Sequence, residues 1–161
     1  MKINIRETTE IPTLMHWRKE VIENVFGITP SKRLLVANHR YYRQNIANGR
    51  HIAIIAEIEN TDVGCGAVCL SEELPSPDNF SGRCAYLMNV YVREEYRTKG
   101  VDHAIVRWLV EKAKQLGCDK IYLETTDSAR TLYKNIGFED LSGFMKYADI
   151  QNIEPRNNVG Q

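Results

Sequence analysis

The stretch that decides the fold reads VYVREEYRTKGVDH and covers residues 90–103. It ends a β-type run over residues 84–93 and leads into a helix predicted over residues 98–116, whose apolar side chains share one face. The first N–H groups of a helix have no acceptor within the helix, and the helix dipole adds partial positive charge there. Because Gly100 leaves the backbone bare, this strand–turn–helix start is typical of an anion site. The alternative is a solvated helix start with a flexible glycine.

Hydrophobic periodicity predicts the elements around this stretch. The predicted strands cover residues 2–6, 51–58, 63–70, 84–93 and 120–125, with two closing strands at 137–141 and 143–149. The predicted helices cover residues 10–25, 29–48, 98–116 and 128–135, and an irregular loop covers residues 71–83. Hairpins in the first half and a βαβ crossover in the second predict a mixed α/β (α+β) fold, in which helices cover the sheet.

Composition limits the classes of protein. The length of 161 residues with 43% hydrophobic side chains fits a single domain, expected over residues 1–149, followed by a polar C-terminal tail over residues 150–161. The 21 basic and 21 acidic side chains cancel, so no basic face for nucleic acid is expected.

The sequence also argues against a secreted, membrane-bound or metal-binding protein. The amino terminus lacks an apolar stretch of signal-peptide type, and no apolar run is long enough to span a bilayer. We therefore expect a cytoplasmic protein without a membrane partner. The four cysteines have neither CxxC spacing nor a nearby histidine at zinc spacing, so no metal is expected and the thiols are interpreted as buried and reduced.

Two motifs carry a resemblance to a known family. The run YRTKGVDHAIVRWLV at residues 96–110 resembles motif A of the GNAT superfamily, the Gcn5-related N-acetyltransferases, with Arg97 and Gly100 at its pattern positions. The run SARTLYKNIGFED at residues 128–140 resembles the second landmark of the family, a helix carrying Leu-Tyr followed by a Gly-Phe turn. The element order over about residues 2–149 is similar to the GNAT topology. The resemblance implies the GNAT acyl-CoA N-acyltransferase fold, a mostly antiparallel mixed sheet with a splayed parallel pair, flanked by helices.

The resemblance also implies a site. The co-substrate would be acetyl-CoA, its pantetheine arm on the strand before motif A and its pyrophosphate on the amides of the helix start. Tyr133 would donate a proton to the departing sulfur when an amine attacks the thioester. The implied cofactor-binding residues are Val90, Tyr91, Val92, Arg97, Thr98, Lys99, Gly100, Val101, Asp102, His103, Thr126, Arg130 and Tyr133.

Two positions depart from the family pattern. Motif A normally ends in Gly or Ala, and here it ends in Asp102, whose carboxylate faces two phosphates unless it turns away or pairs with a neighbouring cation. Many relatives carry a general base at or near the position of Met88, which has no acid–base group. Glu124 is the base candidate at the end of the next strand, with Asp127 beside it and His51 more distant.

The acceptor is not specified by the sequence. In the family the first two helices build its pocket, and here they carry Trp17, Arg18, Tyr41 and Tyr42 among others. The aromatic residues are interpreted as core residues or contacts of a homodimer. Three arginines of the second helix either hold an acidic substrate or form a solvated face: Arg33, Arg40 and Arg43.

Three hypotheses follow for the function. The first is acetyl transfer from acetyl-CoA to a primary amine of a small molecule or protein. The second is a non-catalytic acyl-CoA-binding protein. The third is an unrelated α/β domain that binds a nucleotide phosphate, although neither GxxxxGK[ST] nor GxGxxG is present.

Overall fold

The computed structural model describes residues 1–148. The strands are β1 (Ile3–Thr8), β2 (His51–Ile58), β3 (Thr61–Glu72), β4 (Arg83–Val92) and β5 (Lys120–Leu123). The α-helices are α1 (Ile11–Val25), α2 (Lys32–Ala47), α3 (Val101–Gln115) and α4 (Arg130–Ile136). Two short 3-10 helices, η1 (Glu94–Lys99) and η2 (Asp127–Ala129), precede α3 and α4.

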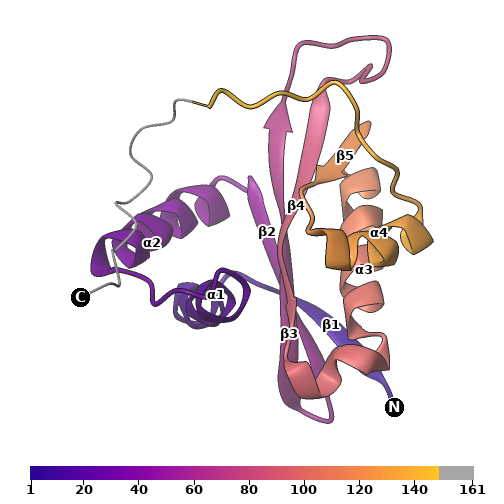
Figure 1. Cartoon of the computed structure of the whole chain (residues 1–161). Helices are drawn as coiled ribbons and strands as arrows, with labels where there is room; N and C mark the ends of the chain where they lie inside the picture. The colour runs from indigo at the N-terminus through magenta and orange to yellow at the C-terminus, as the bar shows by residue number, and fades with distance from the viewer. Residues whose placement is uncertain (149–161) are drawn as a thin grey trace.

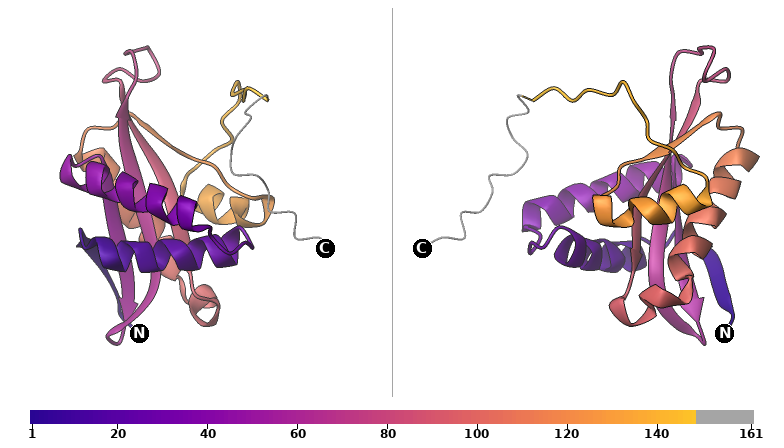
Figure 2. Two further views of the ribbon diagram at one scale, coloured as in Figure 1. Left: turned by 90° about the vertical axis from the view of Figure 1, so that its left-hand side faces the viewer. Right: turned by 45° about the vertical axis from the view of Figure 1, so that its right-hand side comes forward.

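One five-stranded sheet organises the fold, with its strands in the order β1-β2-β3-β4-β5. The first three pairings are antiparallel, and β4 and β5 run parallel. Helices α1 and α2 cover one face of the sheet, and α3 and α4 cover the other (Figures 1 and 2). The predicted α/β fold, a mixed and mostly antiparallel sheet flanked by helices, is therefore confirmed.

The parallel pair stays together over only part of its length. The ladder joins residues 84–87 of β4 to residues 120–123 of β5, and β4 then continues to Val92 without β5 beside it. Just beyond the ladder Asn89 adopts a left-handed backbone with φ of 57°, and the β3–β4 register shifts between Cys65 and Ala67. Such a bulge bends a strand, so the final residues of β4 are left with a free edge beside β5. The predicted splay of the parallel pair is found here.

The position of α3 is set by close packing on β3. Its side chains Ile105 and Leu109 are fully buried. A Cβ atom at Gly66 would lie 2.6 Å from Cγ2 of Ile105, so only glycine lets the helix approach this closely. Because α3 is held against the sheet, its first turn is fixed beside the end of β4.

The two closing strands predicted at residues 137–141 and 143–149 are wrong within the described chain, since residues 137–148 contain no strand. Alternating side chains alone do not make a strand, which also needs a partner edge for its hydrogen bonds. Instead Phe144 rests its ring on Tyr122 of β5, with a centroid distance of 6.5 Å. Residue 149 and the predicted tail lie outside the described residues.

The first half and the crossover follow the prediction closely, with small shifts at element ends. The helix predicted from residue 98 begins as α-helix at Val101, because η1 occupies the preceding residues. Within residues 1–148 no helix combines the length and apolarity needed to cross a membrane.

Candidate active site

The predicted anion site lies where η1 turns into α3. Gly100 has φ of 76°, a left-handed backbone that favours glycine, and a Cβ atom there would meet nothing within 4 Å. Arg97 donates from Nε to the carbonyl oxygen of Val92 at 3.1 Å, which ties the turn to the end of β4. Thr98 and Lys99 complete the exposed turn. The structure thus brings the N–H groups at the start of α3 next to the end of β4, whose edge on the β5 side is free.

Asp102 places its carboxylate on this helix start. Its Oδ1 accepts a hydrogen bond from the backbone N–H of His103 at 2.8 Å and lies 3.3 Å from Nδ1 of the same residue. Of the cation partners considered from the sequence, His103 is therefore the one found. One of the N–H groups that would otherwise meet a phosphate is already occupied by a negatively charged group.

Tyr133 lies on α4, half-buried, with its ring in edge contact with Phe138 at a centroid distance of 5.8 Å. The turn of the second motif fixes this position, since the N–H groups of Gly137 and Phe138 both donate to the carbonyl oxygen of Tyr133. Burial raises the pKa of the Tyr133 phenol, and the negative charge of Asp102 raises it further. The phenol therefore keeps its proton at neutral pH, and it lies close enough to Asp102 at the start of α3 to be affected by that charge.

The free edge of β4 offers backbone rather than side chains. Tyr91 and Val92 are buried, and Val90 is partly buried against the α3 side of the core. The ring of Tyr91 turns to the opposite face, where it meets Trp17 of α1 at a centroid distance of 6.3 Å. Because these side chains pack into the core, the segment presents mainly its peptide groups at the gap beside β5.

The loop between β5 and α4 carries the remaining candidates. Glu124 is exposed, and its charge is felt by the neighbouring Tyr86, whose pKa is raised first by burial and then by Glu124. Thr126 is also exposed and shares a hydrogen bond with Ser128, with 3.0 Å between the hydroxyl oxygens. Arg130 is engaged by two carboxylates of its own chain, Asp140 and Asp127. A phosphate would therefore have to compete for this guanidinium.

Comparison with known proteins tests the family resemblance. The sequence matches the Acetyltransferase (GNAT) family over residues 13–138, well over half of the chain. The chain belongs to the GNAT family. The predicted resemblance, drawn from the two motifs, is confirmed.

Solved GNAT structures resemble this chain over most of its length. A predicted acetyltransferase of Clostridium acetobutylicum, crystallised with acetyl-CoA, is 27% identical with a TM-score of 0.81, covering 91% of this chain and 96% of that one. Glucosamine-6-phosphate N-acetyltransferase of Arabidopsis thaliana is 22% identical with a TM-score of 0.67, covering 92% and 100%, and shares the fold.

Curated GNAT relatives match over a shorter stretch. Thialysine N-epsilon-acetyltransferase of Bos taurus is 36% identical over 70 residues, which is 42% of this chain and 41% of that protein. The enzyme of the same name from Sus scrofa is 36% identical over 66 residues, 39% of each chain. The matched stretch thus spans about two fifths of these relatives.

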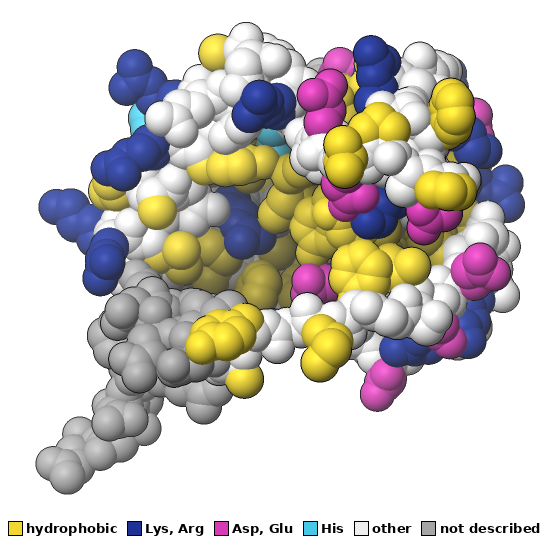
Figure 3. Space-filling view, turned by 90° about the horizontal axis from the view of Figure 1, so that it is seen from above, with side chains coloured by type: hydrophobic (Ala, Val, Ile, Leu, Met, Phe, Trp, Pro, Cys, Tyr) yellow, Lys and Arg dark blue, Asp and Glu magenta, His cyan; other side chains and the backbone are white. Residues whose placement is uncertain are grey.

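The first two helices, which the resemblance assigns to the acceptor, border an open face of the molecule. Seen from above, a hollow lined mainly by hydrophobic side chains separates the two helices from the β4–β5 side of the molecule, and a basic side chain lies inside it (Figure 3). The α2 arginines Arg33, Arg40 and Arg43 are exposed, and the latter two border a shallow depression on the α2 surface. The solvated-face interpretation therefore fits these three residues.

Sequence analysis missed a partly buried polar cluster between α2 and the sheet. The Tyr41 hydroxyl lies 3.0 Å from Nδ1 of His51 and 3.0 Å from Sγ of Cys69, which in turn lies 3.1 Å from Sδ of Met88. Burial, helped by the positive charge of Arg18, lowers the pKa of His51 to about 4. The imidazole is therefore neutral at neutral pH, and it is buried with its Nδ1 against Tyr41 and Cys69. The alternation of β2 placed His51 on this face, but its partners come from α2, β3 and β4.

This cluster predicts a pH-dependent stability. Because the pKa of His51 is lowered on folding, the unfolded chain binds the proton more readily, and the free energy of unfolding falls as the pH drops from about 6.5 to about 4. The loss is on the order of 3 kcal/mol. His51→Phe should flatten this slope in urea unfolding series, whereas His39→Gln, a change at an exposed histidine, should leave it unchanged. Equal slopes in wild type and His51→Phe would contradict the prediction.

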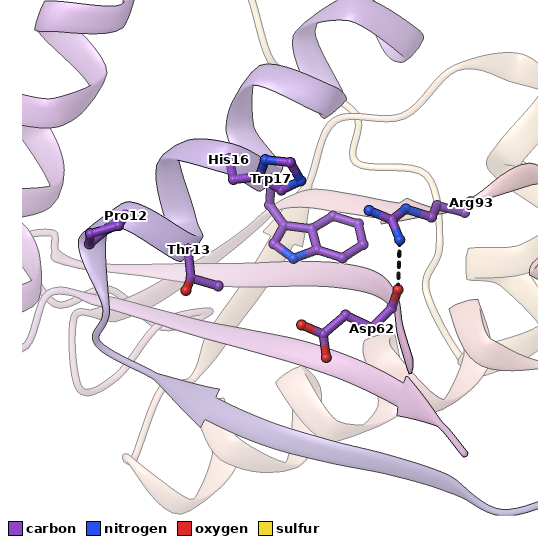
Figure 4. Close-up of a pocket in the computed structure, with 6 residues that line it drawn as sticks. All are labelled: Pro12, Thr13, His16, Trp17, Asp62 and Arg93. Atoms are coloured by element: carbon purple, nitrogen blue, oxygen red, sulfur yellow. Dashed lines mark hydrogen bonds between the residues drawn. The ribbon is translucent and has the colours of Figure 1, made fainter. Parts of the chain in front are cut away.

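A second cavity, of about 420 Å³, lies on the α1 side and is lined by Pro12, Thr13, His16, Trp17, Asp62 and Arg93 (Figure 4). Arg93 stacks its guanidinium on the Trp17 ring at 4.6 Å and donates to the Asp62 carbonyl oxygen at 2.9 Å. It also donates two hydrogen bonds to Glu20, at 2.8 and 2.9 Å. Because its cation is already paired, the cavity reflects packing of α1 on the sheet and does not belong to the site above.

Proposed function

We propose that the protein transfers an acetyl group from acetyl-CoA to a primary amine of a small molecule or protein, by direct attack of the amine on the thioester. The observation that carries the proposal is the convergence of a protonated phenol, Tyr133, with the open helix start at Gly100 beside the free edge of β4. The similar Clostridium protein crystallised with acetyl-CoA supports the choice of donor.

The residues present fit acetyl-CoA. Peptide groups of Val90 to Val92 would bind the pantetheine arm along the free edge of β4, and the amides from Arg97 to His103 would hold the pyrophosphate. Thr126 and Arg130 would add contacts from the loop before α4. When bound, acetyl-CoA supplies an activated acyl group with a thiolate leaving group.

The chain itself supplies the proton for the leaving group. The Tyr133 phenol, whose pKa is raised by burial and by Asp102, is protonated before the reaction and can donate to the sulfur as the C–S bond breaks. The attacking amine must first lose a proton, since an ammonium has no lone pair. Met88 has no acid–base group, and His51 is buried with its Nδ1 against Tyr41 and Cys69.

Glu124 is the remaining base proposed, acting through water from the end of β5. We expect Glu124→Gln to lower kcat/KM near neutral pH by about 100-fold, at the lower end of general-base effects. The loss should shrink as the pH approaches the pKa of the substrate amine, because free amine then needs no base. Glu111→Gln, a change at an exposed carboxylate of α3, is the matched control. A loss that is equal at every pH would point to a structural role instead.

Release of free thiol from acetyl-CoA in the presence of a panel of amines tests the proposal. Thiol release that depends on an amine, with the acetylated amine found by mass spectrometry, is the expected result. One observation favours the second candidate, a non-catalytic acyl-CoA-binding protein: the Asp102 carboxylate already occupies an N–H group of the phosphate site. Calorimetric binding of CoA without amine-dependent thiol release would select that candidate and reject the enzyme.

A further inference from the structure

Arg18 of α1 reaches across the acceptor side of the site. Its Nε donates to Oδ1 of Asn38 on α2 at 3.1 Å, and its Nη1 donates to Oδ1 of Asn89 on β4 at 2.8 Å. The residue is only partly exposed. Its guanidinium is therefore fixed in direction by two helices and a strand, as a binding group must be.

Among the described residues, the charge of Arg18 is not balanced by an acidic side chain, and its remaining contact is a cation–π one, with Cζ 5.7 Å from the Phe26 ring centroid. Both hydrogen-bond partners are neutral amides, and within residues 1–148 no carboxylate lies within 4 Å of its guanidinium. Glu20, two residues along α1, is held by Arg93 through two hydrogen bonds. Burial is the main cause of the lowered pKa of His51, and the positive charge of Arg18 contributes to it. Partly burying an unpaired charge is unfavourable, so an anion that binds there gains from the pairing.

The guanidinium also has donors to spare. Arginine has five N–H donors in a planar fork, and within the described residues 1–148 two of them are used, in the bonds to Asn38 and Asn89. The remaining donors match the two oxygens of a carboxylate, the partner that arginine binds best. Exposed Arg33, by contrast, lies on the outer surface of α2, where water already solvates its charge.

Arg18 is bonded to the strand that would carry the pantetheine arm. Asn89, which accepts its hydrogen bond, is the bulged residue directly before Val90, where the proposed pantetheine path begins. An anion held by Arg18 therefore lies on the α1–α2 side of β4, next to the gap through which the thioester would be reached. The contact is made by the same bulge that opens this gap.

We propose that Arg18 binds a carboxylate of the acceptor, so that the preferred substrate is an amine that also carries a carboxylate, as an amino acid does. The proposal rests on the acetyl transfer proposed above and names the substrate class of that site. The bound carboxylate would orient the acceptor so that its amine points past Asn89 toward the thioester.

Matched pairs of amines test this substrate class. Each pair differs only in the carboxylate: lysine and cadaverine, thialysine and its decarboxylated counterpart, phenylalanine and phenethylamine. In at least one pair we expect kcat/KM for acetylation to be about tenfold to a hundredfold higher for the carboxylate form, the range of a charge-assisted hydrogen bond. Arg18→Gln should reduce that ratio to near one, and Arg33→Gln should leave it unchanged.

The ratio within a pair separates binding from folding, because a general loss of structure lowers both members equally. Arg18→Lys, which keeps the charge but loses the fork, should keep part of the preference. Wild-type ratios near one in every pair, or a ratio that survives Arg18→Gln, would overturn the inference while thiol release still supported acetyl transfer.

A binding measurement keeps the two proposals distinct. Saturation-transfer NMR of thialysine and its decarboxylated counterpart, with CoA present, needs no turnover. Stronger transfer to thialysine in wild type than in Arg18→Gln is expected even if no acetylation occurs. Equal signals in both proteins would reject the carboxylate site, whereas absent thiol release with every amine would reject only the acetyl transfer.

Discussion

Replacing Tyr133 by Phe is expected to lower kcat for acetyl transfer by about 100-fold to 10,000-fold, the range of a lost general acid. The KM for acetyl-CoA should change little, because the phenol acts only as the sulfur departs. The ring packing on Phe138 is preserved in the variant, so the fold should be unaffected. Steady-state thiol release at saturating amine measures the change.

Tyr122→Phe is the matched control for this prediction. Tyr122 is also partly buried, lies on the neighbouring β5 and stacks on Tyr86 at a centroid distance of 5.1 Å. Loss of its hydroxyl should leave kcat nearly unchanged. If Tyr133→Phe also retained wild-type turnover, Tyr133 would be a packing residue and the proton would have to come from water.

Replacing Asp102 by Gly is expected to tighten CoA binding by about tenfold to a hundredfold. The change frees the N–H group of His103 and removes a negative charge at the phosphate site, and like charges about 4 Å apart repel by roughly 1 kcal/mol in water and 4 kcal/mol at an effective dielectric of 20. The variant also loses a carboxylate that stabilises the start of α3 by about 0.3–1 kcal/mol. Calorimetric titration with CoA at two salt concentrations measures the effect.

Asp102→Asn separates the effect of the negative charge from the effect of the hydrogen bond to the His103 N–H group. The amide can still accept from His103 but carries no charge, so it should bring only part of the gain. The pKa of Tyr133 should also fall in both variants, because the Asp102 charge contributes to its elevation. Unchanged CoA affinity in Asp102→Gly would mean that the carboxylate swings aside when the cofactor binds.

The parts of the fold that could be predicted are those set by residues adjacent in the sequence. The helix start at Gly100 and the turn at Gly137 depend on glycines with left-handed backbones and on the residues around them, so both motifs could be located from the sequence. The closing strands were not predictable in this way. Their alternation at residues 137–141 is a local signal, whereas strand formation depends on a partner edge elsewhere.

In the candidate site, too, local motifs could be predicted, and contacts between distant residues could not. The Tyr133 and Gly100 positions followed from their motifs, but the orientation of Asp102 toward His103 depends on a side-chain torsion that sequence does not reveal. Arg18 was one of several charged residues on the first two helices. What sets Arg18 apart from them is its pair of hydrogen bonds to Asn38 and Asn89, which lie 20 and 71 residues away in sequence. Only folding brings these amides together around one guanidinium.

The bulge at Asn89 links the two halves of the proposed site mechanically. Its left-handed backbone turns β4 away from β5, while its side chain holds Arg18 on the opposite face of the sheet. The proposed pantetheine path and the proposed carboxylate contact at Arg18 thus share one residue, Asn89. Changes elsewhere on α1 and α2 can retune the choice of amine while the thioester stays in register, whereas a change at Asn89 would disturb both partners of the reaction at once.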